Sequence, residues 1–202
     1  MRTGDHFAAG DGNGQSYLCH IESFSKKGLV YGQVEQLQAS DPPLQLNVGV
    51  GLCKAERLEW LLEKAAELGV GSLTPLVTKF CTGGFRHERG LKIVRNSCAL
   101  AGRAHLMKLQ PSQPLELFLQ SSSGVMFHQG APKWQWECQR ESETERQASP
   151  TPVSHICVGP EGGFSPEELE MAQQHGWTVR GLGPRNLRVE TAALAVISLL
   201  TL

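Results

Sequence analysis

The sequence predicts an α/β fold built around a parallel β-sheet and preceded by a small β domain. Three observations lead to this prediction. From residue 51 onward helical patterns alternate with short apolar strand patterns, two late strands are each followed by a glycine turn and a helix, and the first 50 residues carry strand patterns only. Because strands separated by helices pair in parallel through right-handed crossovers, we expect an α/β domain over residues 49–202 and a β domain over residues 1–48.

The expected β domain rests on short runs of β-branched, aromatic and alternating apolar residues. These runs mark strands at 17–22, 29–35 and 44–50. The segment Asp11-Gly12-Asn13-Gly14 has the composition of a hairpin turn. So short a β segment buries little apolar surface by itself, and we therefore expect it to lean on the rest of the chain.

The α/β domain is expected to contain four helices. Helical patterns cover residues 54–68, 88–105, 166–175 and 191–200, and strand patterns cover residues 72–77, 124–128, 153–158 and 177–182. The last helix is apolar on nearly every face, so it must be deeply buried or shared with a partner subunit. Residues 129–152 are polar and poor in aliphatic side chains, which indicates an exposed excursion.

The composition excludes several classes of protein. No stretch approaches the roughly 20 apolar residues of a membrane span, and residues 1–15 lack the apolar core of a secretory signal. The six cysteines are scattered without a CxxC pair, which argues against a zinc site and a disulfide framework. We therefore expect a cytoplasmic protein without a metal and without a membrane association.

The net charge of −1 argues against a nucleic-acid partner, but one segment is strongly basic. Between residues 79 and 108 a single acid, Glu88, faces seven basic residues: Lys79, Arg86, Arg89, Lys92, Arg95, Arg103 and Lys108. Such a segment can attract phosphates by charge and counterion release. A solvated helix face is the more ordinary explanation of the same pattern.

A first glycine turn, residues 158–163 (VGPEGG), joins a predicted strand to a predicted helix. Its three glycines allow backbone conformations that are closed to other residues. Ser165 and Glu168 have the spacing of a capping box at the start of the following helix. A turn of this kind lies at the carboxyl edge of a parallel sheet, where α/β proteins usually bind ligands, although a tight connection without a ligand has the same pattern.

A second glycine turn, residues 182–188 (LGPRNLR), precedes the apolar last helix. Two turns from successive crossovers can bracket one flat ligand. Arg185 and Arg188 are costly beside so apolar a helix unless each pairs with an anion, although a surface ion pair explains Arg185 equally well. Glu190 or Thr191 can cap the helix that begins here. Neither turn has the GxGxxG pattern of a dinucleotide site or the ending of a P-loop.

Three segments carry a family resemblance. Residues 56–70 (ERLEWLLEKAAELGV), 159–168 (GPEGGFSPEE) and 182–192 (LGPRNLRVETA) resemble the RsmE family of 16S ribosomal RNA uracil-N3 methyltransferases, part of the SPOUT superfamily. The likeness runs from about Gly51 to the C-terminus. It implies a SPOUT-type parallel sheet with a deep trefoil knot near residues 155–202, a knot that general folding rules would not propose. It also implies a homodimer that acts on 16S rRNA in the small ribosomal subunit.

The resemblance further implies the cofactor and its site. S-adenosylmethionine binds in this family against the main chain of the two glycine turns. The residues expected to contact the cofactor are Val158, Gly159, Pro160, Glu161, Gly162, Gly163, Leu182, Gly183, Leu187 and Arg188. Because N3 of uracil must lose a proton before it attacks the methyl group, Arg103 and Arg188 are candidate catalytic cations beside the base. Glu190 is a further catalytic candidate, although helix capping explains it equally well.

Some positions depart from the family's pattern. Phe80 stands where the family commonly has an arginine, Ala99-Leu100 where Glu-Gln is usual, His105 where a basic residue is usual, and Asn186 where an apolar residue is usual. Arg103 keeps its place. These departures affect the expected RNA side more than the cofactor side.

Residues 1–48 resemble the end of the family's PUA-like, RNA-binding barrel, with residues 1–5 (MRTGD) matching its LRxGD stretch. Members of the family begin earlier, so we expect a partial barrel that lacks its first strands.

Other functions stay open from the sequence. The chain can be a catalytically impaired SPOUT-fold protein that binds RNA or the ribosome, or a SPOUT methyltransferase with another RNA target. An NAD-dependent oxidoreductase is a distant alternative, because no acidic residue follows a GxGxxG turn at the expected distance.

Overall fold

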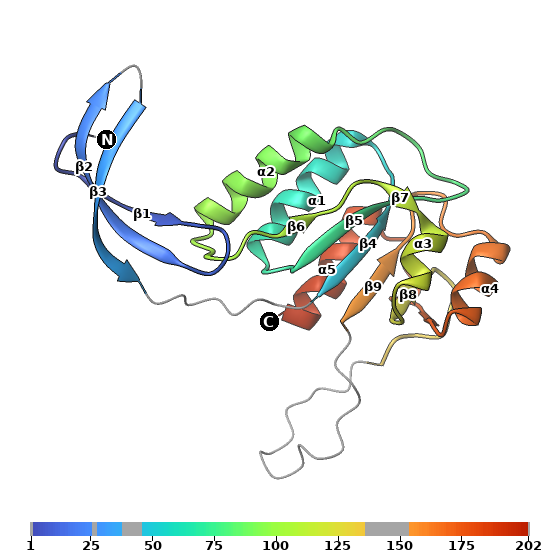
Figure 1. Ribbon diagram of the computed structural model, residues 1–202. Coiled ribbons are helices and arrows are strands. Elements are labelled where there is room, and N and C mark those ends of the chain that lie inside the picture. The colour runs from blue at the N-terminus through green and yellow to red at the C-terminus, as the bar shows by residue number, and fades with distance from the viewer. Residues whose placement is uncertain (1, 26–27, 38–45, 136–153, 202) are drawn as a thin grey trace, which may run out of the picture.

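The computed structural model describes residues 2–25, 28–37, 46–135 and 154–201. Its centre is a seven-stranded sheet (Figure 1) whose path has the order β10-β8-β9-β4-β5-β6, with β7 paired to β5. The strands are β4 (Asn47–Gly51), β5 (Ser72–Val77), β6 (Lys108–Leu109), β7 (Gln113–Pro114), β8 (Val125–Phe127), β9 (His155–Val158) and β10 (Thr178–Arg180). Every pairing in this sheet is parallel, which confirms the predicted α/β domain with a parallel sheet.

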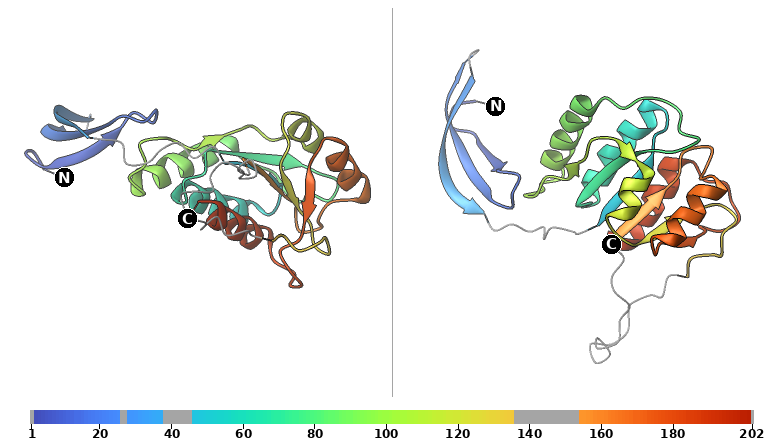
Figure 2. Two further views of the ribbon diagram at one scale, coloured as in Figure 1. Left: turned by 90° about the horizontal axis from the view of Figure 1, so that it is seen from below. Right: turned by 45° about the vertical axis from the view of Figure 1, so that its right-hand side comes forward.

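Helices cover both faces of the sheet (Figures 1 and 2). The first face carries α1 (Ala55–Glu67), α2 (His87–Leu100) and α5 (Val189–Thr201), and the second carries α3 (Leu115–Gln120) and α4 (Pro166–Gln174). Successive strand residues alternate between the two cores. In β9, for example, Ile156 and Val158 join the core under α1 and α5, whereas Cys157 joins the core under α3 and α4. Strands buried on both faces explain why the sequence shows continuous apolar runs here.

Helix α1 forms because its apolar residues recur at helical spacing. Leu58, Leu61, Leu62 and Ala65 are all fully buried. The helix predicted over 88–105 ends earlier, at Leu100, because the chain turns at Ala101-Gly102, where Gly102 has φ +68°. The helix predicted over 191–200 begins two residues earlier, at Val189.

Three antiparallel strands form a separate N-terminal sheet, with β1 (His6–Gly10), β2 (Ser16–Ser25) and β3 (Gly28–Leu37) in that order. The predicted hairpin turn is confirmed, and Asp11 Oδ1 accepts hydrogen bonds from the amides of Asn13 and Gln15 at 2.7 and 3.0 Å. The predicted third strand of this domain is wrong: β4 joins the parallel sheet instead, so the expected boundary at residue 48 falls inside β4.

The N-terminal sheet does lean on the α/β part, through its hairpin turn. The amide of Gly14 donates to the carbonyl of Ala104 at 3.0 Å, and the amide of Leu106 donates to the carbonyl of Gly12 at 3.0 Å. The contact therefore falls on the segment that follows α2. In every view this sheet lies at the opposite end of the molecule from α4 (Figures 1 and 2).

Within the part of the chain that the structure describes, no helix has the length and apolarity needed to cross a membrane. Most of the polar excursion predicted over 129–152 lies outside the described residues, and so does Trp136. Trp134 is described, and its ring packs edge-on against Phe127 at a centroid distance of 5.1 Å.

Candidate functional site

A cavity of about 530 Å³ lies at the carboxyl ends of β8, β9 and β10, three neighbouring strands of the sheet. Each strand contributes the loop that follows it, and α5 closes one side. The lining residues are Phe127, His128, Gln129, Gly130, Val158, Gly159, Pro160, Glu161, Gly162, Gly163, Leu182, Gly183, Arg185, Asn186, Leu187, Arg188, Val189 and Ala192. A concave site at this edge of a parallel sheet, of a size that suits a small organic ligand, is the usual binding place of α/β proteins.

The first glycine turn is held in shape by local bonds at its two ends. The amide of Gly163 donates to the carbonyl of Pro160 at 2.9 Å, and Gly163 has φ +71°, a conformation that side chains other than glycine rarely adopt. The predicted capping box is confirmed: Ser165 Oγ accepts from the Glu168 amide at 3.3 Å, and Glu168 Oε2 accepts from the Ser165 amide at 2.8 Å. The turn therefore enters α4 at a fixed point.

The second glycine turn borders two cavities. A second, more open cavity of about 480 Å³ shares Asn186, Leu187 and Arg188 with the first one. Its other lining residues are Trp60, Glu190 and Thr191. The indole of Trp60 is 46% exposed, so this cavity has an aromatic wall that faces solvent.

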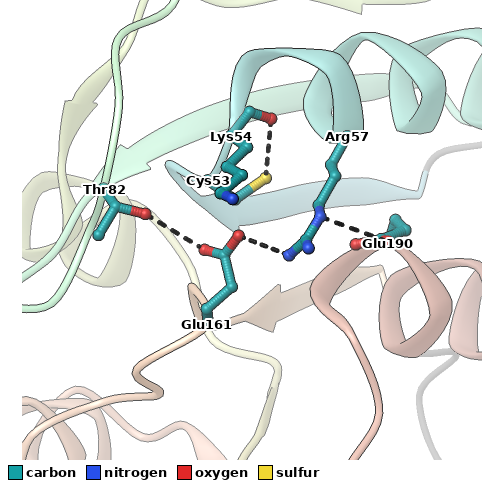
Figure 3. Close-up of polar contacts among 6 residues, drawn as sticks. All are labelled: Cys53, Lys54, Arg57, Thr82, Glu161 and Glu190. Atoms are coloured by element: carbon teal, nitrogen blue, oxygen red, sulfur yellow. Dashed lines mark hydrogen bonds and ion pairs between the residues drawn. The ribbon is translucent and has the colours of Figure 1, made fainter.

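Acidic side chains from the first turn and from the start of α5 meet at one arginine of α1 (Figure 3). Arg57 Nη1 donates to Glu161 Oε1 at 2.8 Å, and Arg57 Nε lies 3.9 Å from Glu190 Oε1. The hydroxyl of Thr82 donates to Glu161 Oε2 at 3.5 Å. The side chain of Glu161 thus points toward α1, although the residue itself lines the first cavity.

The thiol of Cys53 lies beside this cluster and donates to the carbonyl of Lys54 at 3.8 Å (Figure 3). Burial, followed by the negative charges of Glu161 and Glu190, raises the pKa of Cys53 from 9.0 to about 12. The thiol therefore stays protonated at neutral pH and cannot serve as a nucleophile there.

The structure gathers the sequence-predicted cofactor residues around a single cavity. All ten of them, from Val158 to Gly163 and from Leu182 to Arg188, line the first cavity. Of the catalytic candidates, Arg188 lines both cavities and Glu190 lines the second. Glu190 is 9% exposed, and its Oε2 has no hydrogen-bond partner among the described residues.

Arg103 lies elsewhere and lines neither cavity. Its side chain is buried, and its guanidinium donates to the carbonyls of Ala66, Gly69 and Val70 at 2.8, 3.3 and 3.2 Å. The carbonyl of Ala66 belongs to the last turn of α1, where a helix leaves acceptors without helical partners, and those of Gly69 and Val70 lie in the chain that follows the helix. Within this chain Arg103 therefore closes the end of α1, and a role beside the substrate stays a prediction.

The positions that depart from the family's pattern fall mostly away from the cavities. Ala99 and Leu100 are exposed at the end of α2, and Leu100 is 89% exposed. His105 forms bridges with the hairpin turn of the N-terminal sheet. Phe80 is closer to the first cavity and is 43% exposed. It packs tightly on Gly162: a Cβ added to Gly162 would lie 2.7 Å from the Cβ of Phe80.

Several lining residues were not predicted from the sequence. Residues 127–130 form the loop after β8, and Val189 and Ala192 complete the wall beside α5. The available signal for the loop was a predicted strand followed by Gly130. Among the described residues, no group of three or more His, Cys, Asp or Glu side chains is placed to hold a metal ion.

Comparisons with known proteins agree with this geometry. A family model described as an RNA methyltransferase domain matches residues 40–201. Ribosomal RNA small subunit methyltransferase E of Rickettsia conorii is 26% identical over 204 residues, which cover 98% of this chain and 81% of that protein. The resemblance identified in the sequence is confirmed.

Two solved structures share the fold. A Legionella pneumophila protein described as a methyltransferase, solved with the cofactor SAM bound, is 29% identical with a TM-score of 0.82, over 99% of this chain and 84% of the other. Ribosomal RNA small subunit methyltransferase E of Neisseria gonorrhoeae, bound to S-adenosyl methionine, is 23% identical with a TM-score of 0.84, over 98% and 83% of the two chains. The match to the family model spans most of the sequence, and the chain therefore belongs to the RNA methyltransferase family.

Proposed function

We propose that this chain transfers a methyl group from S-adenosylmethionine to N3 of a uridine in 16S ribosomal RNA of the small subunit. The observation that carries the proposal is the convergence of three loops on one cavity at the carboxyl edge of the sheet, in a chain of the RNA methyltransferase family. The relatives are named for methylation of small-subunit ribosomal RNA, and the 29% identical Legionella protein was solved with SAM. A cytoplasmic location follows from such a substrate.

The lining of the first cavity fits S-adenosylmethionine. The cavity lies within the volume range of small-ligand sites, and both glycine turns present main-chain N–H and C=O groups, which can bind an adenosine by hydrogen bonds. Apolar side chains such as Leu182, Leu187 and Ala192 can pack against its flat ring. The cofactor supplies a methyl group on a positively charged sulfur, and the protein's main task is then to position the acceptor base.

Arg188 and Glu190 are proposed to act on the base that accepts the methyl group. Uracil N3 carries a weakly acidic proton, and Arg188 at the border of the two cavities can stabilise the anion that forms when this proton leaves. Glu190 Oε2 is buried and has no partner among the described residues, so it can accept a hydrogen bond from an N–H group brought to it. Arg103 lines neither cavity in the described part of the chain, and we propose a role beside the base for it from the family resemblance alone.

The RNA is proposed to lie along α2 and the N-terminal sheet. Lys92 and Arg95 are exposed on α2, Arg86 is exposed directly before it, and Lys108 is exposed in β6. The hairpin turn of the N-terminal sheet meets the chain between α2 and β6, so the two parts can form one continuous surface. We propose residues 1–48 as part of a PUA-like barrel that helps to bind RNA, with residues 49–202 as the methyltransferase domain.

The last segment is proposed to form the trefoil knot and the dimer interface. β10 lies at the edge of the sheet, whereas the helix that follows it, α5, packs against α1 and against the central strands β4 and β9. The chain between β10 and α5 therefore returns from the edge of the sheet past the first glycine turn. Leu199 on α5 and Trp60 on α1 are large apolar side chains that stay exposed in the single chain. A second copy can cover them, and sedimentation of wild type and of Leu199→Glu tests this assembly.

A methylation assay tests the proposed reaction. Small ribosomal subunits from a strain that lacks uridine N3 methylation are incubated with the protein and S-adenosylmethionine, and the RNA is mapped by mass spectrometry. We expect a single new methyl group, on N3 of one uridine. Methylation at another kind of site would identify a different target, and the absence of any methylation would favour a protein that only binds RNA.

A further inference from the structure

We propose that Arg57 is a positioning residue that ties the two glycine turns to the core helix α1 and thereby holds the cofactor cavity in shape. The inference rests on the proposed function, because it assigns a task to Arg57 in the cofactor site. Arg57 lines neither cavity, and its guanidinium instead lies behind both turns, between Glu161 and Glu190 (Figure 3).

The backbone that carries Arg57 is held firmly in place. Arg57 lies in the first turn of α1, and its amide donates to the carbonyl of Lys54 at 3.0 Å. The leucines that follow it on α1 are fully buried under the sheet, so the helix cannot shift without opening the core. The guanidinium therefore starts from a fixed place, whereas its two partners lie on or just after loops.

The two carboxylates come from different strand-to-helix connections, Glu161 beside the first cavity and Glu190 beside the second. Glu161 is in the turn after β9, and its Oε1 accepts from Arg57 Nη1 at 2.8 Å. Glu190 opens α5 directly after the turn that follows β10, and its Oε1 lies 3.9 Å from Arg57 Nε. A planar guanidinium with several donors can engage two carboxylates at once, which a single ammonium group does less well.

Loss of this cation leaves two acidic groups facing each other. Glu190 is nearly buried and already has one oxygen without a partner among the described residues, so an uncompensated charge there is costly. The pKa of the neighbouring Cys53 is raised first by burial and then by the same two negative charges. The least costly relief is for the turns to move toward water, and because these turns form the cavity wall, the site loosens.

Lys64 provides a matched control on the same helix. Its Nζ also contacts two carboxylates, Glu63 at 2.7 Å and Glu67 at 2.9 Å, but both belong to α1 itself. Lys64→Met and Arg57→Met each remove one cation and introduce the same side chain, yet only Arg57→Met cuts a connection between α1 and the turns. Arg57→Lys keeps the charge and tests whether the guanidinium fork is needed.

Two measurements on the purified chain decide the proposal. In hydrogen–deuterium exchange without cofactor, we expect Arg57→Met to speed exchange in peptides that contain residues 158–163 and 182–190, and Lys64→Met to leave them unchanged. In calorimetry with S-adenosylmethionine, we expect Arg57→Met to raise Kd about tenfold, Arg57→Lys to raise it less, and Lys64→Met to leave it as in wild type.

The exchange experiment separates this proposal from the proposed function. Wild-type exchange rates at both turns in Arg57→Met would overturn the positioning role, and so would equal acceleration in Lys64→Met, which would indicate a general loss of stability. If the wild type itself failed to bind S-adenosylmethionine, the proposed function would fail, while the exchange rates would still decide what Arg57 does.

Discussion

The arginines that line the first cavity lie in different surroundings, and we therefore expect them to contribute differently to the reaction. Arg185 and Arg188 both line the first cavity, but Arg188 also borders the second cavity, next to the buried carboxylate of Glu190. We expect Arg188→Ala to lower the rate of methyl transfer about 100-fold, because a cation beside the developing uracil anion is lost. Single-turnover methylation of ribosomal subunits measures this rate.

Arg185→Ala is the matched comparison for Arg188→Ala and should cause a clearly smaller loss. Equal rates of methyl transfer for Arg188→Ala and wild type would show that Arg188 takes no part in the reaction.

The thiol of Cys53 offers a test of the burial and the negative charge behind the two turns. Since its pKa is raised to about 12 by burial, Glu161 and Glu190, we expect Cys53 to react slowly with iodoacetamide at pH 9 in the folded protein. Among the described cysteines, the half-buried Cys81 should be labelled first. Peptide mapping of the labelled protein checks this order, which should disappear in concentrated urea.

The same shift in pKa fixes the sign of a pH effect on stability. The folded chain holds the Cys53 proton more tightly than the unfolded chain, so unfolding releases a proton above pH 9.0. This contribution to the free energy of unfolding is complete below pH 9.0 and is lost as pH rises toward about 12. Fast labelling of Cys53 in the folded state would contradict both expectations.

How well individual residues could be predicted depended on what kind of group they contribute. The glycine turns were predictable because Gly163 and its neighbours adopt a backbone conformation that few other residues allow. The contacts of Arg103 and Arg57 were not predictable, because the sequence around a charged side chain does not indicate which distant group it will bind. Arg103 contacts carbonyls more than 30 residues away, and Arg57 contacts carboxylates more than 100 residues away.

At the level of elements, the end of α1 depends on a side chain from outside the helix. Arg103 donates to three carbonyls there and is 9% exposed. We expect Arg103→Met to lower the free energy of unfolding by about 2–3 kcal/mol, since charge-assisted hydrogen bonds are lost and buried acceptors remain. Urea denaturation measures the change.

Arg95→Met on the exposed face of α2 is the control for Arg103→Met and should change the stability by no more than about 0.5 kcal/mol. The sequence predicted a different role for Arg103, and the two roles can be told apart. Unchanged stability of Arg103→Met together with abolished methylation would place Arg103 beside the substrate, in line with the family resemblance.

The long helices were predictable from the sequence, whereas α3, β6 and β7 were not. Helix α1 has thirteen residues and five fully buried apolar positions at helical spacing, which is enough for its periodicity to stand out. Helix α3 has six residues, and β6 and β7 have two each, so none of them spans enough positions to show a period. These elements form because neighbours such as β5 and the core around Phe118 hold them in place.

At the level of the whole molecule, sequence patterns indicate a strand but not the sheet it joins. Residues 44–50 read as a third strand of the N-terminal domain, yet β4 lies in the middle of the parallel sheet between β9 and β5. Its partners, His155 to Val158 and Ser72 to Leu76, are distant in sequence, so only the assembled fold decides the pairing. The same holds for the path of α5 back to the centre of the sheet.

The arrangement of the whole chain separates the two expected binding surfaces. The N-terminal sheet docks on the segment after α2, at the opposite end of the molecule from α4, and the cavity lies where β9 leads into α4 (Figures 1 and 2). An RNA bound along α2 must therefore present its target base some distance away. A partner subunit that brings a second N-terminal sheet near this cavity would resolve the separation, which agrees with the proposed dimer.

The central claim is that S-adenosylmethionine occupies the cavity at the carboxyl ends of β8, β9 and β10, and calorimetry with a blocked cavity tests it most directly. Ala192 on α5 lines the cavity, whereas Ala99 on α2 is exposed and lines neither cavity. We expect wild type and Ala99→Phe to bind the cofactor at a single site per chain with the same Kd, and Ala192→Phe to bind at least about tenfold more weakly while it unfolds at a similar temperature. A flat titration of the wild type, or wild-type affinity in Ala192→Phe, would contradict the claim.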